Sequence, residues 1–261
     1  MPVKFASLIL LMMCLLLLPG ASVPDAGKET VSTASASTGI ERFCLELYNN
    51  IRGDESKPDY EVLRKAITGF FNLESDNRIK KNIITIIDFS LSSNLDRMWI
   101  IDLNKQEVIH SSLCAHGRNS GDEYACSFSN TPSSYKSSLG FYVTGDTYTG
   151  KHGLSLLLDG AEPGVNDKAR ERAIVMHGAD YVSRDFISRN GRLGRSFGCP
   201  SIPMEDHENI INMLSGQSCL YIHFPDAGYL KSSSLLVDET AAGGMSRFLN
   251  ESLAGSLSSM F

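Results

Sequence analysis

Two residues in the second half of the chain have the types and the order that nucleophilic catalysis needs. His177 ends an apolar run and is followed by a glycine, and Cys199 follows later in a Ser-Phe-Gly-Cys turn. A cysteine attacks as its thiolate, and a nearby imidazole can take up the thiol proton. The end of a strand would fix His177 as the base, and the glycine in the turn would let the sulfur of Cys199 be exposed. The backbone N–H groups of Gly198 and Cys199 are predicted to stabilise the oxyanion of an acyl transfer.

The same two residues also have a structural interpretation, because a lone cysteine is often buried and inert. The cysteine count favours a chemical role. The chain has six cysteines, and removal of a leader that carries Cys14 would leave an odd number. At least one thiol would then stay free in an oxidising compartment. A disulfide between Cys114 and Cys126 fits an exported protein about as well as two free thiols do.

Strand patterns dominate the region that holds both residues. Short apolar or alternating runs, separated by turn signals, predict strands at residues 83–89, 97–103, 107–115, 139–144, 154–158, 173–177 and 219–224. Helical pieces are expected at 183–189 and 204–214. The sequence therefore predicts a mainly β catalytic core over residues 83–225, a β-sandwich or β-barrel-like sheet with small helices.

Other segments flank this core. Apolar residues at helical spacing predict an N-terminal helical segment over residues 40–82, with Asp59 as the cap of its second helix. Residues 23–39 are rich in Ser, Thr and Ala and predict a disordered linker. Residues 226–261 predict a flexible tail, with a short amphipathic helix as the alternative.

Residues 1–22 predict a signal peptide for export. Lys4 precedes an almost unbroken apolar run over residues 5–18, and small residues follow. The run is short for a bilayer span, so no stable transmembrane anchor is expected, and a retained anchor is the alternative. We therefore expect the protein in the periplasm or cell envelope. A net charge of -6 without any cluster of Lys and Arg argues against nucleic acid as a partner.

The residues around His177 and Cys199 resemble the signature of the YkuD-type L,D-transpeptidases, in which a His-Gly pair precedes a Ser-x-Gly-Cys turn. The similarity is closer to the murein L,D-transpeptidase catalytic-domain relatives found in Gram-negative bacteria. It covers roughly residues 87–221. The pieces that carry it, in order, are AHGRNSG (115–121), SFSNTPSSYKSSLGFYVTG (127–145), GKHGLSLLLDG (150–160), HGADYVS (177–183) and GRLGRSFGCPSIP (191–203).

The resemblance implies a reaction on peptidoglycan stem peptides. Cys199 would attack the carbonyl at the L-centre of diaminopimelate, expel the terminal D-Ala and pass the thioester to an amine of a neighbouring stem. Water as the acceptor would make the protein an L,D-carboxypeptidase or endopeptidase. The resemblance implies no metal and no organic cofactor, and it implies a backbone carbonyl as the partner that orients His177.

Two departures from the family pattern affect the substrate side. Phe197 stands where the widespread pattern has a histidine, and Pro200-Ser201 stands where an arginine is usual. Arg192 and Arg195 precede the turn and are predicted to bind a substrate carboxylate, because a guanidinium grips carboxylates through a bidentate fork. A solvated loop is the alternative for both.

Two further residues complete the predicted substrate site. Ser196 is predicted to hydrogen-bond the substrate, or else to shape the turn. His116, in the Ala-His-Gly motif, is predicted to line the same cleft, with a structural or surface role as the alternative.

Two other functions compete with the transpeptidase. A non-catalytic module could keep the fold and bind the wall, and alkylation of Cys199 would separate the two because only an enzyme needs a reactive thiol. A sortase-like enzyme is disfavoured, because that group needs an arginine soon after the cysteine and the next one here is Arg247.

Overall fold

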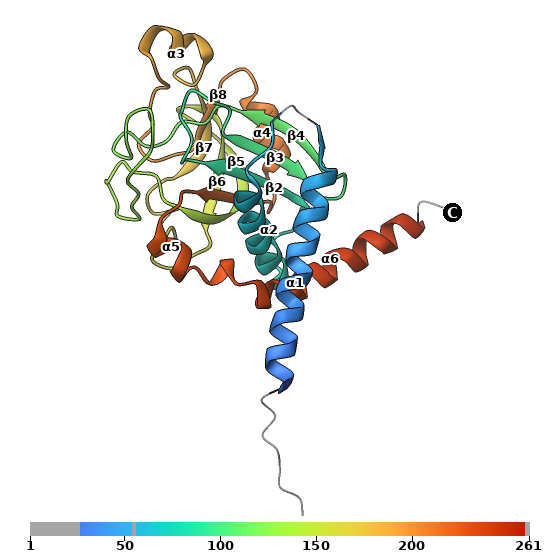
Figure 1. The fold of residues 1–261 in the computed structure, drawn as a ribbon. Helices are drawn as coiled ribbons and strands as arrows, with labels where there is room; N and C mark the ends of the chain where they lie inside the picture. Colours follow the sequence, from blue (N-terminus) through green and yellow to red (C-terminus); the bar gives the residue numbers. More distant parts are fainter. Residues whose placement is uncertain (1–26, 54–55, 259–261) are drawn as a thin grey trace, which may run out of the picture.

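The computed structural model describes residues 27–53 and 56–258, and the predicted signal peptide lies outside them. The core is a nine-stranded sheet with the order β1-β4-β3-β2-β9-β5-β6-β7-β8 (Figure 1). The strands are β1 Arg52–Gly53, β2 Ile83–Asp88, β3 Met98–Asp102, β4 Glu107–Ser112, β5 Gly140–Gly150, β6 Gly153–Gly160, β7 Val175–Ala179, β8 Ser201–Pro203 and β9 Cys219–His223.

The sheet partly closes on itself. Strand β8 pairs in parallel with β7 on one side. On its other side Ser201 bridges to Ala115, which follows β4, and the two backbone hydrogen bonds measure 2.9 and 3.3 Å. The far edge of the sheet thus returns to the chain just after β4, as in a barrel-like sheet.

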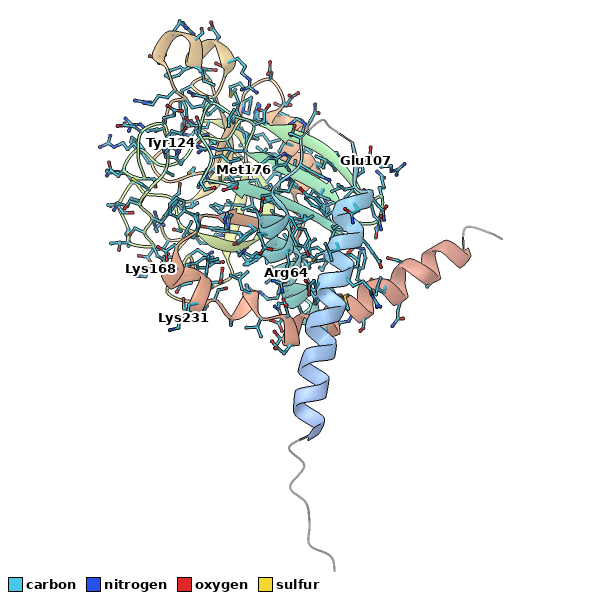
Figure 2. The ribbon with its side chains drawn as sticks, in the orientation of Figure 1. Arg64, Glu107, Tyr124, Lys168, Met176 and Lys231 are labelled. Atoms are coloured by element: carbon cyan, nitrogen blue, oxygen red, sulfur yellow. The ribbon has the colours of Figure 1, made fainter. Side chains whose placement is uncertain are left out.

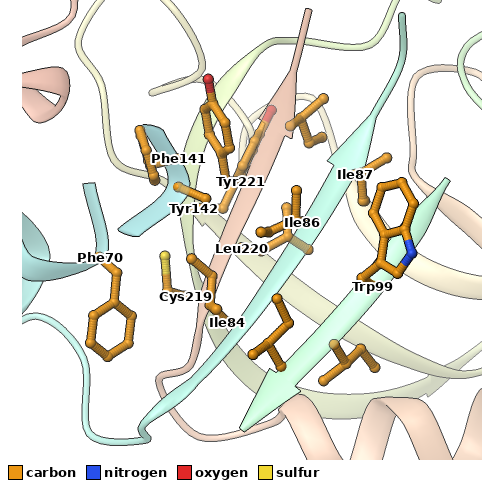
Figure 3. Packing of buried hydrophobic residues seen from close by; sticks show 14 of the residues in the cluster. Phe70, Ile84, Ile86, Ile87, Trp99, Phe141, Tyr142, Cys219, Leu220 and Tyr221 are labelled. Atoms are coloured by element: carbon orange, nitrogen blue, oxygen red, sulfur yellow. The ribbon is translucent and has the colours of Figure 1, made fainter. Parts of the chain in front are cut away.

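Branched and aromatic residues fill the interior of the sheet. Ile84 and Ile86 of β2 lie opposite Cys219 and Tyr221 of the parallel neighbour β9, and the Tyr221 ring stacks on Phe141 of β5 with 4.3 Å between centroids (Figure 3). All five side chains are fully buried. Such β-branched and aromatic pairs suit a strand that is covered on both faces, so this part of the chain forms the central strands.

Three helices pack together beside the sheet: α1 Gly27–Asn50, α2 Tyr60–Ser75 and α6 Asp238–Ser258 (Figure 1). Their shared interior holds Phe43, Phe70, Phe71 and Phe248, whose rings meet edge to face or tilted. A Cβ at Gly244 would lie 2.0 Å from the Phe71 carbonyl oxygen. Only a glycine therefore lets α6 approach α2 this closely.

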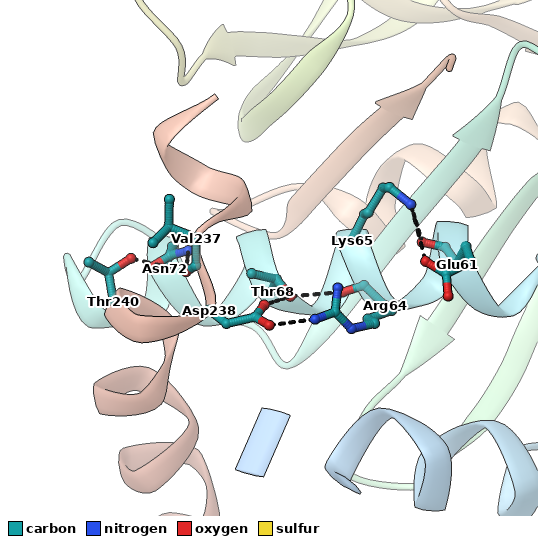
Figure 4. A network of polar contacts seen from close by, with 8 residues as sticks. All are labelled: Glu61, Arg64, Lys65, Thr68, Asn72, Val237, Asp238 and Thr240. Carbon is teal, nitrogen blue, oxygen red and sulfur yellow. Dashed lines mark hydrogen bonds and ion pairs between the residues drawn. The ribbon is translucent and has the colours of Figure 1, made fainter. Parts of the chain in front are cut away.

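Polar contacts hold the start of α6 against α2 (Figure 4). Asp238 accepts hydrogen bonds from Arg64 and Thr68. Asn72 donates to the carbonyls of Leu235 and Val237. The C-terminal segment is therefore fixed to the N-terminal helices by side chains that are far away in sequence.

The short helices are α3 Arg184–Asn190, α4 His207–Leu214, α5 Ala227–Ser232 and the 3-10 turn η1 Ser234–Leu236. Asp59 caps α2 as predicted, since its side chain accepts from the Glu61 N–H. Within residues 27–53 and 56–258, no helix combines the length and the apolar character that a bilayer span requires.

The prediction of a mainly β core with small helices and an N-terminal helical segment is confirmed. The structure differs from the sequence-based expectation at both ends. Helix α1 begins at Gly27, within the segment 23–39 that was expected to be a disordered linker. The expected flexible tail, 226–261, instead contains α5, η1 and α6 in its described part, because Phe248 and Ala241 are buried against the other helices.

Candidate active site

Strands β7 and β8 position the two predicted catalytic residues. His177 lies in the middle of β7, opposite Ser201 of β8 in the parallel register. Its neighbour Met176 is fully buried in the core cluster. Side chains alternate along a strand, so His177 faces the other side of the sheet from Met176. Cys199 lies two residues before Ser201, so the parallel register places it beside Val175, and its side chain lines the same cavity as His177.

His177 and Cys199 line one cavity of about 390 Å³. Its wall also contains the tip of the hairpin between β5 and β6, the chain just before β7 and the turn before Cys199. The other lining residues are Tyr148, Lys151, His152, Ser155, Arg172, Ala173, Ile174, Val175, Tyr181, Arg195, Ser196 and Phe197. None of the lining side chains is a carboxylate, and besides His177 four of them can carry a positive charge.

The imidazole of His177 is held from both sides. Its Nδ1 lies 2.8 Å from the Gly178 carbonyl oxygen, and its Nε2 lies 3.1 Å from Ser201 Oγ. A carbonyl can only accept a hydrogen bond, so Nδ1 carries the proton and Nε2 is the basic atom. The backbone carbonyl that the family resemblance implied is thus found at Gly178. The ring also stacks on His152, with 4.3 Å between centroids.

Burial lowers the pKa of His177, and the hydrogen bond to Gly178 works against this effect. The positive charges of His152 and Lys151 lower the pKa further. Burial disfavours the charged form of an imidazole because water no longer solvates it. The resting imidazole is therefore neutral, as a general base must be before it takes a proton.

The thiol of Cys199 lines the same cavity as His177 and contacts the chain just before β7. Its Sγ lies 3.7 Å from the carbonyl oxygen of Ala173, a residue with the left-handed φ of 52°. Burial raises the pKa of Cys199, while the Val175 N–H and the charges of Arg172 and Lys151 lower it. Burial has the largest effect, so the resting site holds a neutral thiol rather than a thiolate.

The turn before Cys199 depends on glycine. Gly198 has φ 125°, and a Cβ there would lie 2.8 Å from the Lys136 carbonyl oxygen. The Gly198 N–H donates to Ser196 Oγ at 3.0 Å, and that hydroxyl donates to the Cys199 carbonyl at 2.6 Å. The Gly198 N–H is thus already bonded and does not face a substrate, contrary to the prediction. Ser196 shapes the turn, and of the predicted donors the Cys199 N–H remains for an oxyanion.

Sequence reasoning missed Arg172. This half-buried residue donates to the carbonyls of Ser129 and Lys136 at 2.8 and 2.6 Å and to the Ser138 hydroxyl. It therefore ties the loop of residues 129–138 to the wall of the cavity, and its charge lowers the pKa of Cys199. No local pattern marks Arg172 among the charged residues before β7, and its partners lie more than thirty positions away.

The predicted substrate-binding arginines lie at different distances from the cavity. Arg195 lines it, but its guanidinium already contacts the Gly121 carbonyl at 2.9 Å and Asp122 at 2.6 Å. Arg192 donates to the Leu193 carbonyl and does not line the cavity. The role predicted for Arg192 in carboxylate binding finds no geometric support, because it faces the neighbouring loop.

His116 does not line the cavity either. It is only 1% exposed, and its Nδ1 lies 2.8 Å from the guanidinium of the buried Arg97. Burial and the charge of Arg97 lower the pKa of His116 to about 3. The prediction that His116 lines the cleft is wrong, because the side chain turns into the interior. The neighbouring Gly117 instead packs against the turn, with room for no Cβ between it and Gly198.

The five cysteines of the described chain are all free. Cys114 is buried, and burial raises its pKa to about 12. Cys126 is exposed on the loop and contacts the Ser120 carbonyl. The disulfide considered between Cys114 and Cys126 is therefore not formed. Within the described residues, no group of three or more His, Cys, Asp and Glu side chains is arranged to hold a metal.

The fold and the site define a β-sheet protein with a cysteine and a histidine in one basic cavity. A model of the L,D-transpeptidase catalytic domain matches residues 54–223, which is more than half of the chain. The chain belongs to this family of transpeptidase domains. The resemblance seen in the sequence is thus confirmed at the level of the family, while a Gram-negative origin stays a prediction.

Solved structures are also similar to the chain, but only weakly. An L,D-transpeptidase from Mycobacterium smegmatis is 10% identical with a TM-score of 0.34, over 55% of this chain and 59% of that one. An L,D-transpeptidase from Stackebrandtia nassauensis is 12% identical with a TM-score of 0.34, over 72% of this chain and 91% of that one. The helical cell shape determining protein Pgp2 from Campylobacter jejuni is 11% identical with a TM-score of 0.36, over 68% of this chain and 62% of that one. The chain thus spans only 59% of the Mycobacterium smegmatis protein. No curated protein matches the chain.

Proposed function

We propose that the protein is a peptidoglycan L,D-transpeptidase in which Cys199 is the nucleophile and His177 the general base. The observation that carries the proposal is that both side chains line one cavity. Nδ1 of His177 is fixed on the Gly178 carbonyl, which leaves Nε2 as the basic atom. Membership in the L,D-transpeptidase family supplies the substrate class.

The reaction has two halves. In the first, Nε2 takes the thiol proton, the sulfur attacks the carbonyl at the L-centre of diaminopimelate, and the Cys199 N–H faces the oxyanion. His177 then returns the proton to the D-Ala amine, which leaves as the thioester forms. In the second half, an acceptor amine attacks the thioester, and its proton passes through His177 back to the sulfur.

The charge of the cavity supports an anionic donor. Lys151, Arg172 and Arg195 line it, although Arg195 is paired with Asp122, and none of the lining side chains is a carboxylate. A stem peptide that ends in diaminopimelate and D-Ala carries several carboxylates. Opposite charge raises the local concentration of such a substrate and fixes its orientation.

Water can replace the amine in the second half of this reaction. The protein would then act as an L,D-carboxypeptidase or endopeptidase, and the same acyl-enzyme would precede both outcomes. We also propose that the protein works in the periplasm or cell envelope, because its substrate lies there and residues 1–22 have the pattern of a signal peptide.

Incubation of the purified protein with muropeptides, followed by mass spectrometry, tests the proposal. The expected products are cross-linked dimers with loss of D-Ala, whereas D-Ala loss without dimers identifies the hydrolase. Cys199→Ala should abolish both and keep the melting temperature. Cys126→Ala removes an exposed thiol outside the cavity and should leave turnover unchanged. Muropeptides that stay intact with the wild-type protein, whose folding is verified, would favour a wall-binding module without catalysis.

A further inference from the structure

A row of hydrogen bonds connects the cavity to the far side of the His177 ring. The Tyr181 hydroxyl lies 3.0 Å from Ser201 Oγ, and Ser201 Oγ lies 3.1 Å from His177 Nε2. On the other side of the ring, Nδ1 contacts the Gly178 carbonyl at 2.8 Å. Ser201 is fully buried, while Tyr181 is half-buried and lines the cavity. Two hydroxyl groups, those of Ser201 and Tyr181, thus link the basic nitrogen of His177 to the cavity.

The carbonyl at one end fixes the direction of this row. Because the Gly178 oxygen can only accept, Nδ1 donates and Nε2 must accept from Ser201. Ser201 has used its only hydrogen and therefore accepts from Tyr181. In the resting site the hydrogens thus run from Tyr181 through Ser201 to Nε2.

We propose that Tyr181 and Ser201 are positioning residues that let His177 take up the thiol proton by reversing this row. The inference rests on the proposed function, since it assigns a role in the same proton transfer. When Nε2 takes up the proton of Cys199, it changes from an acceptor to a donor, so the Ser201 hydroxyl rotates towards Tyr181. The new Nε2–H then donates to Ser201 Oγ, and the Tyr181 O–H turns into the cavity.

The reversal involves one proton transfer and two hydroxyl rotations. The S–H bond of Cys199 breaks and an N–H bond forms on His177, which leaves a thiolate beside an imidazolium. Hydroxyls suit this task because the same group donates in one state and accepts in the other. A hydrogen bond from a charged donor is stronger than one to a neutral acceptor, so Ser201 stabilises the imidazolium more than the neutral ring.

Other titratable groups also face His177. His152 and Lys151 do so from the hairpin tip, and His207 from the start of α4. Replacement of a hydroxyl on Ser201 or Tyr181 leaves these groups in place. A comparison of such variants therefore reports on the hydroxyl row alone.

The test is the rate of Cys199 alkylation by iodoacetamide between pH 5 and 10, read by mass spectrometry of the peptide that contains Cys199. Around neutral pH the reactive thiolate exists through proton transfer to His177, so Ser201→Ala should slow the reaction by roughly fivefold to tenfold. At the high-pH end, where the thiol ionises to solvent, the two rates should converge. Tyr181→Phe should show the same pattern with a loss of about twofold to threefold.

The double variant and a control make the test specific. Ser201→Ala with Tyr181→Phe should behave like Ser201→Ala alone, because Tyr181 acts through Ser201. Tyr124→Phe removes a phenol hydroxyl from an exposed residue on the loop-rich side of the molecule (Figure 2) and should match the wild type.

The outcomes also separate this inference from the proposed function. If His177→Asn slows alkylation at neutral pH but Ser201→Ala and Tyr181→Phe do not, the hydroxyl row has no role and the inference fails. The inference also fails if the rate losses of the two single variants multiply in the double variant. It fails as well if these rate losses persist at high pH. If His177→Asn itself matches the wild type, the proposed base is wrong and the proposed function fails with it.

Discussion

The helical end of the molecule and the Cys199 turn are held together by different kinds of contact. At the helical end, α1, α2 and α6 meet through the side chains of Phe43, Phe71 and Phe248, which fill a shared interior. At the turn, Gly117 and Gly198 pack backbone against backbone, and most of the holding contacts are hydrogen bonds to carbonyl oxygens.

This difference teaches where stability and chemistry lie in the chain. Apolar volume buried between helices contributes free energy of folding, and its loss is felt by the whole domain. The hydrogen-bonded turn buries little apolar surface but fixes the position of a sulfur and an N–H group. Substitutions in the two regions should therefore separate into those that lower stability and those that lower reactivity.

The largest effect is expected for Gly198→Ala. The φ of 125° and the contact with the Lys136 carbonyl leave no room for a Cβ, so the turn must shift and move the sulfur. A shift of about 1 Å is enough to lower muropeptide turnover by roughly a hundredfold. Gly191→Ala is the control, because that residue also has a positive φ, of 75°, but open space around it. Turnover by Gly198→Ala close to the wild-type rate would contradict the strict packing of the turn.

The next largest effect is expected for Phe70→Ala in the helical interior. This fully buried ring should cost about 3 to 5 kcal/mol in the free energy of unfolding, measured in urea. The pH profile of Cys199 alkylation should stay unchanged while the protein is folded. Leu249→Ala, which is 41% exposed on α6, should cost less than about 0.5 kcal/mol. A changed alkylation profile in folded Phe70→Ala would show that the two regions are coupled.

A smaller effect concerns acid stability and the buried imidazole of His116. Its pKa is about 3 in the folded protein, against about 6.5 when unfolded. The folded state then binds fewer protons, so stability is complete above pH 6.5 and falls as the pH drops towards 3. At pH 5 the loss from this residue is about 2 kcal/mol. His116→Gln should reduce the difference in unfolding free energy between pH 7 and pH 5 by that amount, and an unchanged difference would assign the acid loss elsewhere.

The smallest effect is expected for Arg172→Gln. Loss of the positive charge removes an influence that lowers the pKa of Cys199, so the thiolate becomes rarer. Alkylation of Cys199 near neutral pH should slow by roughly fivefold. Arg170→Gln is the matched control, because Arg170 pairs with Asp159 outside the cavity. Equal rates for the two variants would show that the charge of Arg172 does not reach the sulfur.

Local sequence patterns were enough to predict much of the fold. Runs such as residues 83–89 and 219–224 became β2 and β9, because β-branched and aromatic residues between turn signals favour strands whatever they pair with. The C-terminal helix was less clear, since its apolar residues are sparse and the helix depends on packing against α2.

The amino-acid sequence by itself determined that His177 and Cys199 are the candidates for nucleophilic chemistry, through residue types, neighbouring glycines and the motif around them. Only the tertiary structure decided their partners. Ser201 meets His177 through the parallel register of β7 and β8, Arg172 reaches a loop far away in the chain, and His116 turns inward. Hydrogen bonds between distant segments depend on strand register and loop closure, and neither leaves a periodic trace in the sequence.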